Sequence, residues 1–194
     1  MIKIFILLKF ILILGGCTYQ YTNEYNLDSR DVKKIKLNVK SFEINKDSLD
    51  YTATDNLLQN EINKKVLKEL ESWAWQKFSI GGKENSAFLS VLKIDTSLIE
   101  KKKIKQTILS IIEQGKEVYK ISLKFDLSIN ADSNSSLIKK LKITSSLEFV
   151  LLNKYSIAQR DKVIIYNVNK LIKLIDEKIT FQLNNKAFNK FVIK

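Results

Sequence analysis

The chain has 194 residues and a hydrophobic content of 45%, which is typical of one globular domain and excludes an intrinsically disordered protein. Lysine and arginine number 33 against 21 acidic residues, so the formal net charge is +12. The chain has no histidine and a single cysteine, which excludes Ser-His-Asp and Cys-His catalysis and removes the commonest metal ligand. We therefore expect no catalytic residue, no metal site and no cofactor. Catalysis by carboxylates alone is the enzyme class that stays open.

The basic charge is carried almost entirely by lysine, because Arg30 and Arg160 are the only arginines. Bidentate recognition of phosphates and bases prefers the planar guanidinium of arginine, so we expect no nucleic-acid partner. Two explanations of the lysine excess stay open. The abundance of Ile, Asn and Lys and the absence of Pro are typical of an AT-rich genome, in which case the lysines form a solvated surface. Alternatively, they form a site for anionic lipid head groups or an acidic envelope polymer.

Residues 1–16 are nearly all Ile, Leu and Phe, with Lys3 near the start and two glycines at the end. This run is shorter than the roughly 20 apolar residues that span a membrane, and a short apolar run with a basic start is typical of an export signal. The segment Leu14-Gly15-Gly16-Cys17 resembles the bacterial lipobox. The resemblance implies cleavage between Gly16 and Cys17, a diacylglyceryl group on the Cys17 sulfur and an acylated amino terminus. Two alternatives stay open: an ordinary signal peptide, or a buried apolar strand.

A lipid on Cys17 would set the location of the protein. Each buried methylene contributes about 0.8 kcal/mol, so three acyl chains would hold the protein on a membrane essentially irreversibly. Thr18 follows the cysteine, whereas lipobox proteins retained at the inner membrane often carry an acidic residue there. This resemblance implies the outer membrane, facing the periplasm, with the inner membrane as the alternative. Residues 17–31 are polar and aperiodic, which predicts a lipidated tether or, alternatively, a first strand folded back on the domain.

The first predicted elements of the domain are a strand and a helix. Residues 32–44 alternate between apolar and polar side chains, the period of a half-buried strand. The alternation slips near Lys40-Ser41, where we expect a bulge in a single strand. A helix is then expected from Asp55 or Asn56 to about residue 78, because apolar residues recur there at steps of three and four. The pair Gly81-Gly82 is expected to end this helix.

A second strand is expected over 87–98, followed by a lysine-rich segment. Isoleucines recur at helical spacing within 104–113, which predicts a short amphipathic helix with basic flanks between two strands. Its functional interpretation is contact with a membrane surface or a partner. The alternative is that the isoleucines cover an open end of the sheet. The residues of this predicted contact are Lys101, Lys102, Lys103, Ile104, Lys105 and Ile108.

The clearest alternation covers 119–129, where apolar side chains occupy one face and Lys, Ser and Asp the other. A polar turn over 130–136 leads to a second alternating segment over 141–151. We expect these segments to form an antiparallel hairpin with one packed face and one wet face. Ser145 is the one small inward residue of the second strand, and we expect a bulky helix residue opposite it.

The last predicted element is a long amphipathic helix from Asp161 to about Ala187, and Phe188 and Phe191 either extend it or fold back. The order is then β-α-β-β-β-α. A mostly antiparallel four-stranded sheet with one apolar face needs a cover, which two amphipathic helices provide. We therefore predict one α+β domain over 32–194, a two-layer sandwich with two helices on one face of the sheet.

The lipobox and this element order together resemble small α+β envelope lipoproteins, among them the lipopolysaccharide-assembly lipoprotein and the auxiliary lipoproteins of lipid-moving ABC transporters. The chain is also similar, over about 33–187, to an uncharacterised bacterial envelope lipoprotein family. In that family a helix ends in Trp followed by Gly, and a strand ends in an Asp-small-small-apolar-apolar-Glu pattern. The matching residues are Trp73 with Gly81, and Asp95-Thr96-Ser97-Leu98-Ile99-Glu100. The resemblance implies an envelope location and no known activity.

Three functional hypotheses follow. The first is a non-enzymatic, lipid-anchored accessory or scaffold of an envelope assembly or transport complex, with an envelope protein as its partner. The second is a lipid or polyanion (lipopolysaccharide-like) binding module that uses the lysine-rich segment. The third is an enzyme that uses carboxylates alone, for which Asp95 and Glu100 would be the pair. The other interpretation of these two residues is hydrogen bonding at a strand end and charge balance against the lysines that follow.

Overall fold

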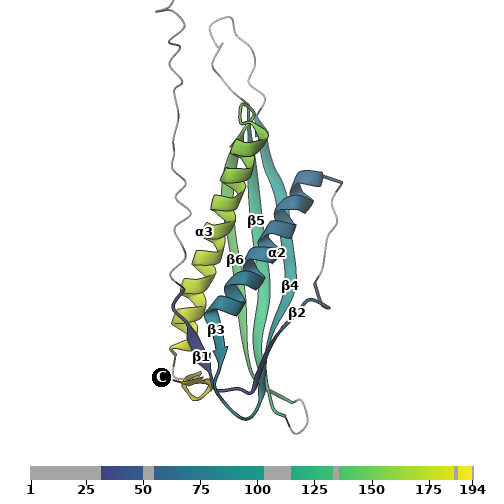
Figure 1. Cartoon of the computed structure of the whole chain (residues 1–194). Helices are drawn as coiled ribbons and strands as arrows, with labels where there is room; N and C mark the ends of the chain where they lie inside the picture. Colours follow the sequence, from purple (N-terminus) through teal and green to yellow (C-terminus); the bar gives the residue numbers. More distant parts are fainter. Residues whose placement is uncertain (1–31, 50–54, 103–114, 133–135, 186–187, 194) are drawn as a thin grey trace, which may run out of the picture.

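The computed structural model describes residues 32–49, 55–102, 115–132, 136–185 and 188–193. Within these ranges the chain forms two sheets, two long helices and one short 3-10 helix (Figure 1). In chain order the elements are β1 (Ile35–Leu37), β2 (Ser41–Asn45), α2 (Leu57–Lys77), β3 (Phe78–Ile80), β4 (Ser86–Lys102), β5 (Lys116–Asn130), β6 (Leu137–Leu152), α3 (Ile157–Leu183), η1 (Asn189–Phe191) and β7 (Val192–Ile193).

The main sheet has the strand order β2-β4-β5-β6, with β2 parallel to β4 and the other neighbours antiparallel. Helices α2 and α3 pack on one face of its long strands (Figure 1). This arrangement confirms the predicted α+β fold, in which two helices cover a mostly antiparallel four-stranded sheet. A second sheet of three short strands, in the order β3-β1-β7, lies at one end of the molecule and was not predicted.

The prediction of a single strand over 32–44 is wrong, because this segment forms two strands that belong to different sheets. β1 pairs with β3 and β7, whereas β2 pairs with β4. Between them, the backbone N–H of Asn38 donates to the carbonyl oxygen of Phe191 at 2.8 Å, and that of Lys40 donates to Asn85 at 3.0 Å. The slip in the alternation therefore marks the point where the chain crosses from one sheet to the other.

Helix α2 begins at one of the predicted caps. Asn56 is the N-cap, and its side-chain oxygen accepts hydrogen bonds from backbone N–H groups of the first turn. The helix ends at Lys77 and passes directly into β3, so the prediction that Gly81-Gly82 ends the helix is wrong. The glycines follow β3 instead. A Cβ atom on Gly82 would lie 2.5 Å from the carbonyl carbon of Asn38, so this close approach of two backbones requires glycine.

Strand β4 is longer than the predicted strand over 87–98, and its register with β5 shifts twice. The shifts lie between Val91 and Lys93 and between Leu98 and Glu100, so Leu92 and Ile99 are the inserted residues. Each insertion moves the inward-facing positions by one residue along β4. The two bulges explain why this segment alternates less regularly than 119–129.

Strands β5 and β6 form the predicted antiparallel hairpin, with its packed face towards the helices. On β6, the Oγ of Ser145 lies 3.3 Å from the Nζ of Lys178 on α3, so a helix lysine reaches the small inward residue. The apolar residues predicted to face inward on β5 are all buried: Tyr119, Ile121, Leu123, Phe125, Leu127 and Ile129.

Helix α3 begins earlier than predicted. Its N-cap is Ser156 rather than a residue near Asp161, and Ser156 and Gln159 exchange the two hydrogen bonds of a capping box. The helix ends at Leu183 instead of about Ala187, and the chain then folds back through η1 into β7. Its predicted apolar stripe is buried throughout: Ile164, Val168, Leu171, Ile172, Ile175, Ile179 and Leu183.

Side chains fill the space between the helices and the main sheet. Trp73 of α2 meets Phe125 of β5 in an edge-to-face contact, with ring centroids 6.4 Å apart. Trp75 lies on the other side of the helix, is 59% exposed and touches only the edge of the core through Phe42. The buried hydrophobic residues of the described chain run from Leu37 to Phe191, so a chain that begins at Thr18 retains all of them.

Candidate functional site

Most residues singled out by the sequence lie outside the described ranges. These are Gly16 and Cys17 of the predicted cleavage and lipidation site, the tether over 17–31, and Lys103, Ile104, Lys105 and Ile108 of the predicted contact helix. Lys101 and Lys102 are the last two residues of β4. Among the described helices, none is long and apolar enough to span a membrane. Among the described residues there is also no group of three or more Cys, Asp or Glu placed to hold a metal ion.

Lys101 belongs to a charged cluster at the end of the main sheet. Its Nζ lies 3.1 Å from Oε1 of Glu117, and the other carboxylate oxygen accepts from the Arg160 guanidinium at 2.8 Å and the Tyr119 hydroxyl at 3.0 Å. Burial raises the pKa of Glu117, but hydrogen bonds from Lys101 and Tyr119 and the charges of Lys101 and Arg160 hold it below its ordinary value. Burial, followed by the hydrogen bond to Glu117, raises the pKa of Tyr119 to about 12. Lys101 is therefore part of a salt bridge that ties β4, β5 and α3 together.

Exposed apolar side chains lie towards the same end of the molecule. Leu57 opens α2 and is 85% exposed, Ile157 opens α3 and is 89% exposed, and Ile99 of the second β4 bulge is 51% exposed. A salt bridge of 3.0 Å between Lys65 and Asp161 holds the first halves of the two helices together. Figure 1 shows both helices starting towards the end where β4 finishes. We call Leu57, Ile99 and Ile157 the apolar tip.

Asp95 and Glu100 do not form a close pair. Asp95 lies opposite Ser122 and Glu100 opposite Val118, which are four residues apart on β5 and thus about 13 Å apart along the strand. Acid–base carboxylate pairs of glycosidases are about 5–9.5 Å apart. The interpretation of Asp95 as a strand-end residue is also wrong, because β4 continues to Lys102.

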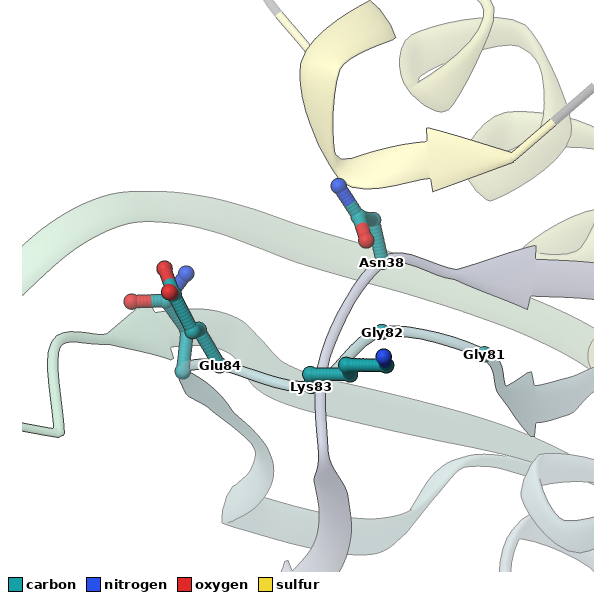
Figure 2. A pocket seen from close by; sticks show the side chains of 6 residues that line it. Asn38, Gly81, Gly82, Lys83 and Glu84 are labelled. Atoms are coloured by element: carbon teal, nitrogen blue, oxygen red, sulfur yellow. The ribbon is translucent and has the colours of Figure 1, made fainter.

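A polar hollow of about 330 Å³ lies where the chain crosses between the two sheets (Figure 2). The backbone N–H groups of Gly81 and Gly82 donate to the carbonyl oxygens of Leu37 and Val39, at 2.9 and 3.0 Å, so neither N–H is available to a ligand. Figure 2 shows the Lys83 and Glu84 side chains directed away from each other. The hollow therefore lies at the junction of the two sheets, and its lining residues do not bring charged groups together. Its lining residues are Asn38, Gly81, Gly82, Lys83, Glu84 and Asn85.

The structure also contains a buried ion pair that the sequence reasoning missed. Lys77 of α2 is fully buried, and its Nζ lies 2.8 Å from Oδ1 of Asp176 and 2.8 Å from Oγ1 of Thr180, both on α3. The Trp73 indole N–H donates to the same Asp176 oxygen at 2.8 Å. The available signal was a lysine at the i+4 position from Trp73 on the apolar stripe. These contacts join the two helices and leave Lys77 out of reach of a substrate.

No protein-family model and no curated protein matches the chain. Similar solved structures exist, among them a Helicobacter pylori protein described as a neuraminyllactose-binding hemagglutinin homologue. The match covers 86% of this chain and 96% of that one, with 9% identity and a TM-score of 0.45. A minor lipoprotein from Acinetobacter baumannii matches over 73% and 94%, with 11% identity and a TM-score of 0.36. Rare lipoprotein B from Shewanella oneidensis matches over 73% and 98%, with 7% identity and a TM-score of 0.33. These likenesses are too distant to assign a function.

Proposed function

We propose that this protein is an envelope lipoprotein, held on the outer membrane by a lipid on Cys17, and that it acts in the periplasm by binding another envelope protein. The observation that carries the proposal is Leu14-Gly15-Gly16-Cys17 at the end of a short apolar run. A lone cysteine in an exported chain cannot form an internal disulfide, and acylation gives it a role. The domain would then be an accessory or scaffold part of an assembly or transport complex.

The filled interior supports a role in protein binding rather than the enclosure of a lipid. Leu70, Trp73 and Phe125 are buried between the helices and the sheet, in the place where an apolar ligand groove would open. A protein with a filled core binds through its surface. The apolar tip is the candidate surface, because Leu57 and Ile157 place two large apolar side chains in solvent at one end of the domain.

The anchor is tested by following acylation in cells. The full chain is expressed with its own leader, a clickable palmitate analogue is supplied, and membranes are separated on a density gradient. We expect the label and the protein together in the outer-membrane fraction, and a Cys17→Ser variant without label. An unlabelled wild-type chain that keeps residues 1–16 would contradict the proposal, and labelled protein in the inner-membrane fraction would contradict the location.

The partner is tested by site-specific crosslinking in the same cells. A photo-crosslinking amino acid replaces Ile157 in one variant and Lys170, on the exposed side of α3, in a matched control. We expect one discrete crosslinked envelope protein from position 157 and none from position 170. Equal crosslinking at both positions, or none at position 157 in a correctly anchored protein, would contradict binding through the apolar tip.

The alternative function, a lipid or polyanion binding module, is tested on its predicted residues. Replacing Lys101, Lys102, Lys103 and Lys105 with Ser would abolish binding to anionic vesicles if that segment is the site. Because Lys101 already pairs with Glu117, we expect this change to alter stability more than binding. A complete loss of binding in a variant of unchanged stability would favour the lysine-rich segment as the site.

A further inference from the structure

The face of the main sheet that points away from α2 and α3 carries mainly polar side chains, and within the described ranges no element packs on it. Figure 1 shows the two helices on the same side of the long strands. Alternate residues of β5 point to this open face, and they are mainly lysine and serine. The open face is therefore a broad solvated surface, which antiparallel sheets commonly have.

Three exposed lysines lie next to one another on this face, and each comes from a different strand. Lys93 of β4 lies directly opposite Lys124 of β5, and Lys142 of β6 is diagonal to Lys124, whose direct neighbour on β6 is Thr144. Directly opposite side chains have Cβ atoms about 5 Å apart, and diagonal ones about 7–8 Å apart. Among the described residues, no carboxylate lies within salt-bridge distance of these lysines. We call Lys93, Lys124 and Lys142 the lysine row.

The first bulge of β4 is what places Lys93 in the lysine row. Val91 lies opposite Phe125 and Lys93 lies opposite Lys124, so Leu92 is an extra residue with no direct partner. In a regular ladder Leu92 would face Lys124, and Lys93 would point towards the helices. Bulges often re-aim a side chain at functional sites, and like charges directly opposite each other destabilise a sheet. The fold thus brings two cations together at a cost in stability.

The acidic residues of the open face do not neutralise the lysine row. Asp126, opposite Lys142, is buried, and its Oδ2 lies 2.6 Å from the Nζ of Lys140. Its other carboxylate oxygen has no hydrogen-bond partner among the described residues. Asp95 lies opposite Ser122, and Glu148 lies opposite Lys120. By the same register Asp95 is diagonal to Lys124, so the three lysines of the row and Lys140 meet two aspartates, Asp95 and Asp126, and two positive charges remain in excess.

We propose that the lysine row binds the anionic head groups of a phospholipid bilayer. Charge complementarity favours a negative partner, and an open, broad face suits an extended surface better than a small ligand. Lysine ammoniums act as point charges without the bidentate geometry of arginine, which matches head groups that move in the plane of a membrane. The serine and threonine hydroxyls between the lysines donate additional hydrogen bonds to phosphate oxygens.

The choice of a membrane as partner rests on the proposed function, because a lipid on Cys17 would hold the domain beside a bilayer. The 15 residues from Cys17 to Asp31 span at most about 50 Å when fully extended. A strand rises about 3.3 Å for each residue, so this reach is comparable to the length of β5. The domain can therefore lie along the membrane with its open face down while it stays anchored.

The inference is tested without the lipid, with a chain that begins at Thr18 and keeps the whole core. Its sedimentation is measured with vesicles of phosphatidylcholine mixed with phosphatidylglycerol, and with vesicles of phosphatidylcholine alone. We expect binding to the mixed vesicles only, and its loss at high salt. Lys93→Gln, Lys124→Gln and Lys142→Gln in one variant should weaken this binding on the order of a hundredfold, since each lysine near an anionic surface contributes about 1 kcal/mol.

The control has the same change in net charge on the opposite side of the molecule. Lys64→Gln, Lys68→Gln and Lys170→Gln remove three exposed lysines of α2 and α3, and this variant should bind nearly as tightly as the wild type. Equal weakening in the two triple variants, or no binding of the wild type to mixed vesicles, would overturn the inference. Binding of the lysine row to soluble dextran sulfate but not to vesicles would overturn it in favour of an acidic polymer. Failure of acylation at Cys17, measured separately in cells, would leave the vesicle result intact.

Discussion

The two faces of the main sheet can be compared along a single strand. On the covered face, β5 presents Tyr119, Phe125 and Ile129, which are buried under α2 and α3. On the open face, the same strand presents Ser122 and Lys124. The covered face is fixed by close packing, where each side chain has many neighbours. The open face has no such requirement, so its residues are free to serve recognition.

The two faces also differ in whether their polar side chains have partners within the protein. On the covered side, the Thr96 hydroxyl donates to the Asn63 side-chain oxygen at 2.7 Å, and both residues are buried. Lys77 is likewise matched by Asp176. On the open side, Lys93 and Lys124 face each other. A polar group without a partner lowers the stability of the protein when it is buried, whereas an exposed polar group forms hydrogen bonds with water.

The largest expected effect on stability comes from removing the buried ring of Phe125, compared with removing the neighbouring exposed side chain of Lys124. We expect Phe125→Ala to lower the free energy of unfolding by about 3–5 kcal/mol, because it removes apolar contacts and leaves a cavity. Lys124→Ala, one position away on the open face, should change it by no more than about 0.5 kcal/mol. Urea denaturation of the chain from Thr18 measures the two values. Similar losses in the two variants would show that the open face is packed against something.

The buried ion pair gives the next largest effect. Asp176→Ala would leave the Lys77 ammonium and the Trp73 indole N–H without their shared acceptor, and we expect a loss of about 3 kcal/mol. The double variant Lys77→Met with Asp176→Asn, which removes both charges and keeps an acceptor for the Trp73 indole N–H, should cost much less than Asp176→Ala alone. Thermal and urea unfolding measure both. A large loss in the double variant would indicate that the ion pair itself, not the need to satisfy each charge, stabilises the contact between α2 and α3.

Periodicity predicted the parts of the fold that repeat. The stripes of α2 and α3 and the alternation of β5 and β6 have buried faces where expected, except that Leu58 and Leu147 are half-buried. The second sheet was missed because its strands have only two or three residues, too few to show a period. Its pairings are also distant in sequence, as between Leu37 and Val192. The start of α3 was missed although Ser156 and Gln159 form a capping-box pattern that the sequence displays.

The candidate sites depended on information that no single segment contains. The polar face of β5 was visible in the sequence, but the position of Lys93 opposite Lys124 depends on the register of two strands and on the bulge at Leu92. Lys77 was visible as a charge on an apolar stripe, but its partner is on another helix. The prediction of lipidation at Cys17 rests on a local motif, and it stays a prediction that the acylation experiment tests.

A smaller effect is expected at the buried hydrogen bond between α2 and β4. Thr96→Val removes the donor and leaves the Asn63 oxygen buried and unsatisfied, so we expect a loss of about 1–3 kcal/mol. Asp95→Val, on the open face next to it, leaves no buried group unpaired and should cost less. The double variant Thr96→Val with Asn63→Leu should recover part of the loss, because no polar group is then left without a partner. An additive double variant would contradict this explanation.

The smallest expected effect is the pH dependence of the charged cluster at the end of the covered face. Hydrogen bonds and neighbouring charges outweigh burial and keep the pKa of Glu117 below its ordinary value of 4.5 in the folded chain. The unfolded chain therefore binds the proton first as the pH falls, so the stabilisation is present above pH 4.5 and is lost as the pH drops through the lower folded pKa. The urea midpoint of Glu117→Gln should fall less steeply than that of the wild type as the pH decreases. The midpoint of Glu148→Gln, a variant on the open face, should fall as steeply as that of the wild type.

Stability at alkaline pH tests the same cluster, and there the stabilisation is lost as the pH rises rather than as it falls. Burial and the hydrogen bond to Glu117 raise the pKa of Tyr119 to about 12 in the folded chain, against an ordinary value of 10.0. The stabilisation from the neutral phenol is therefore complete below pH 10 and declines as the pH rises towards 12. Tyr119→Phe should remove this decline. If Glu117→Gln flattens the acid limb while Tyr119→Phe leaves the alkaline limb unchanged, the hydrogen bond between the two side chains does not stabilise the phenol, and the lysine and arginine contacts alone hold Glu117 in place.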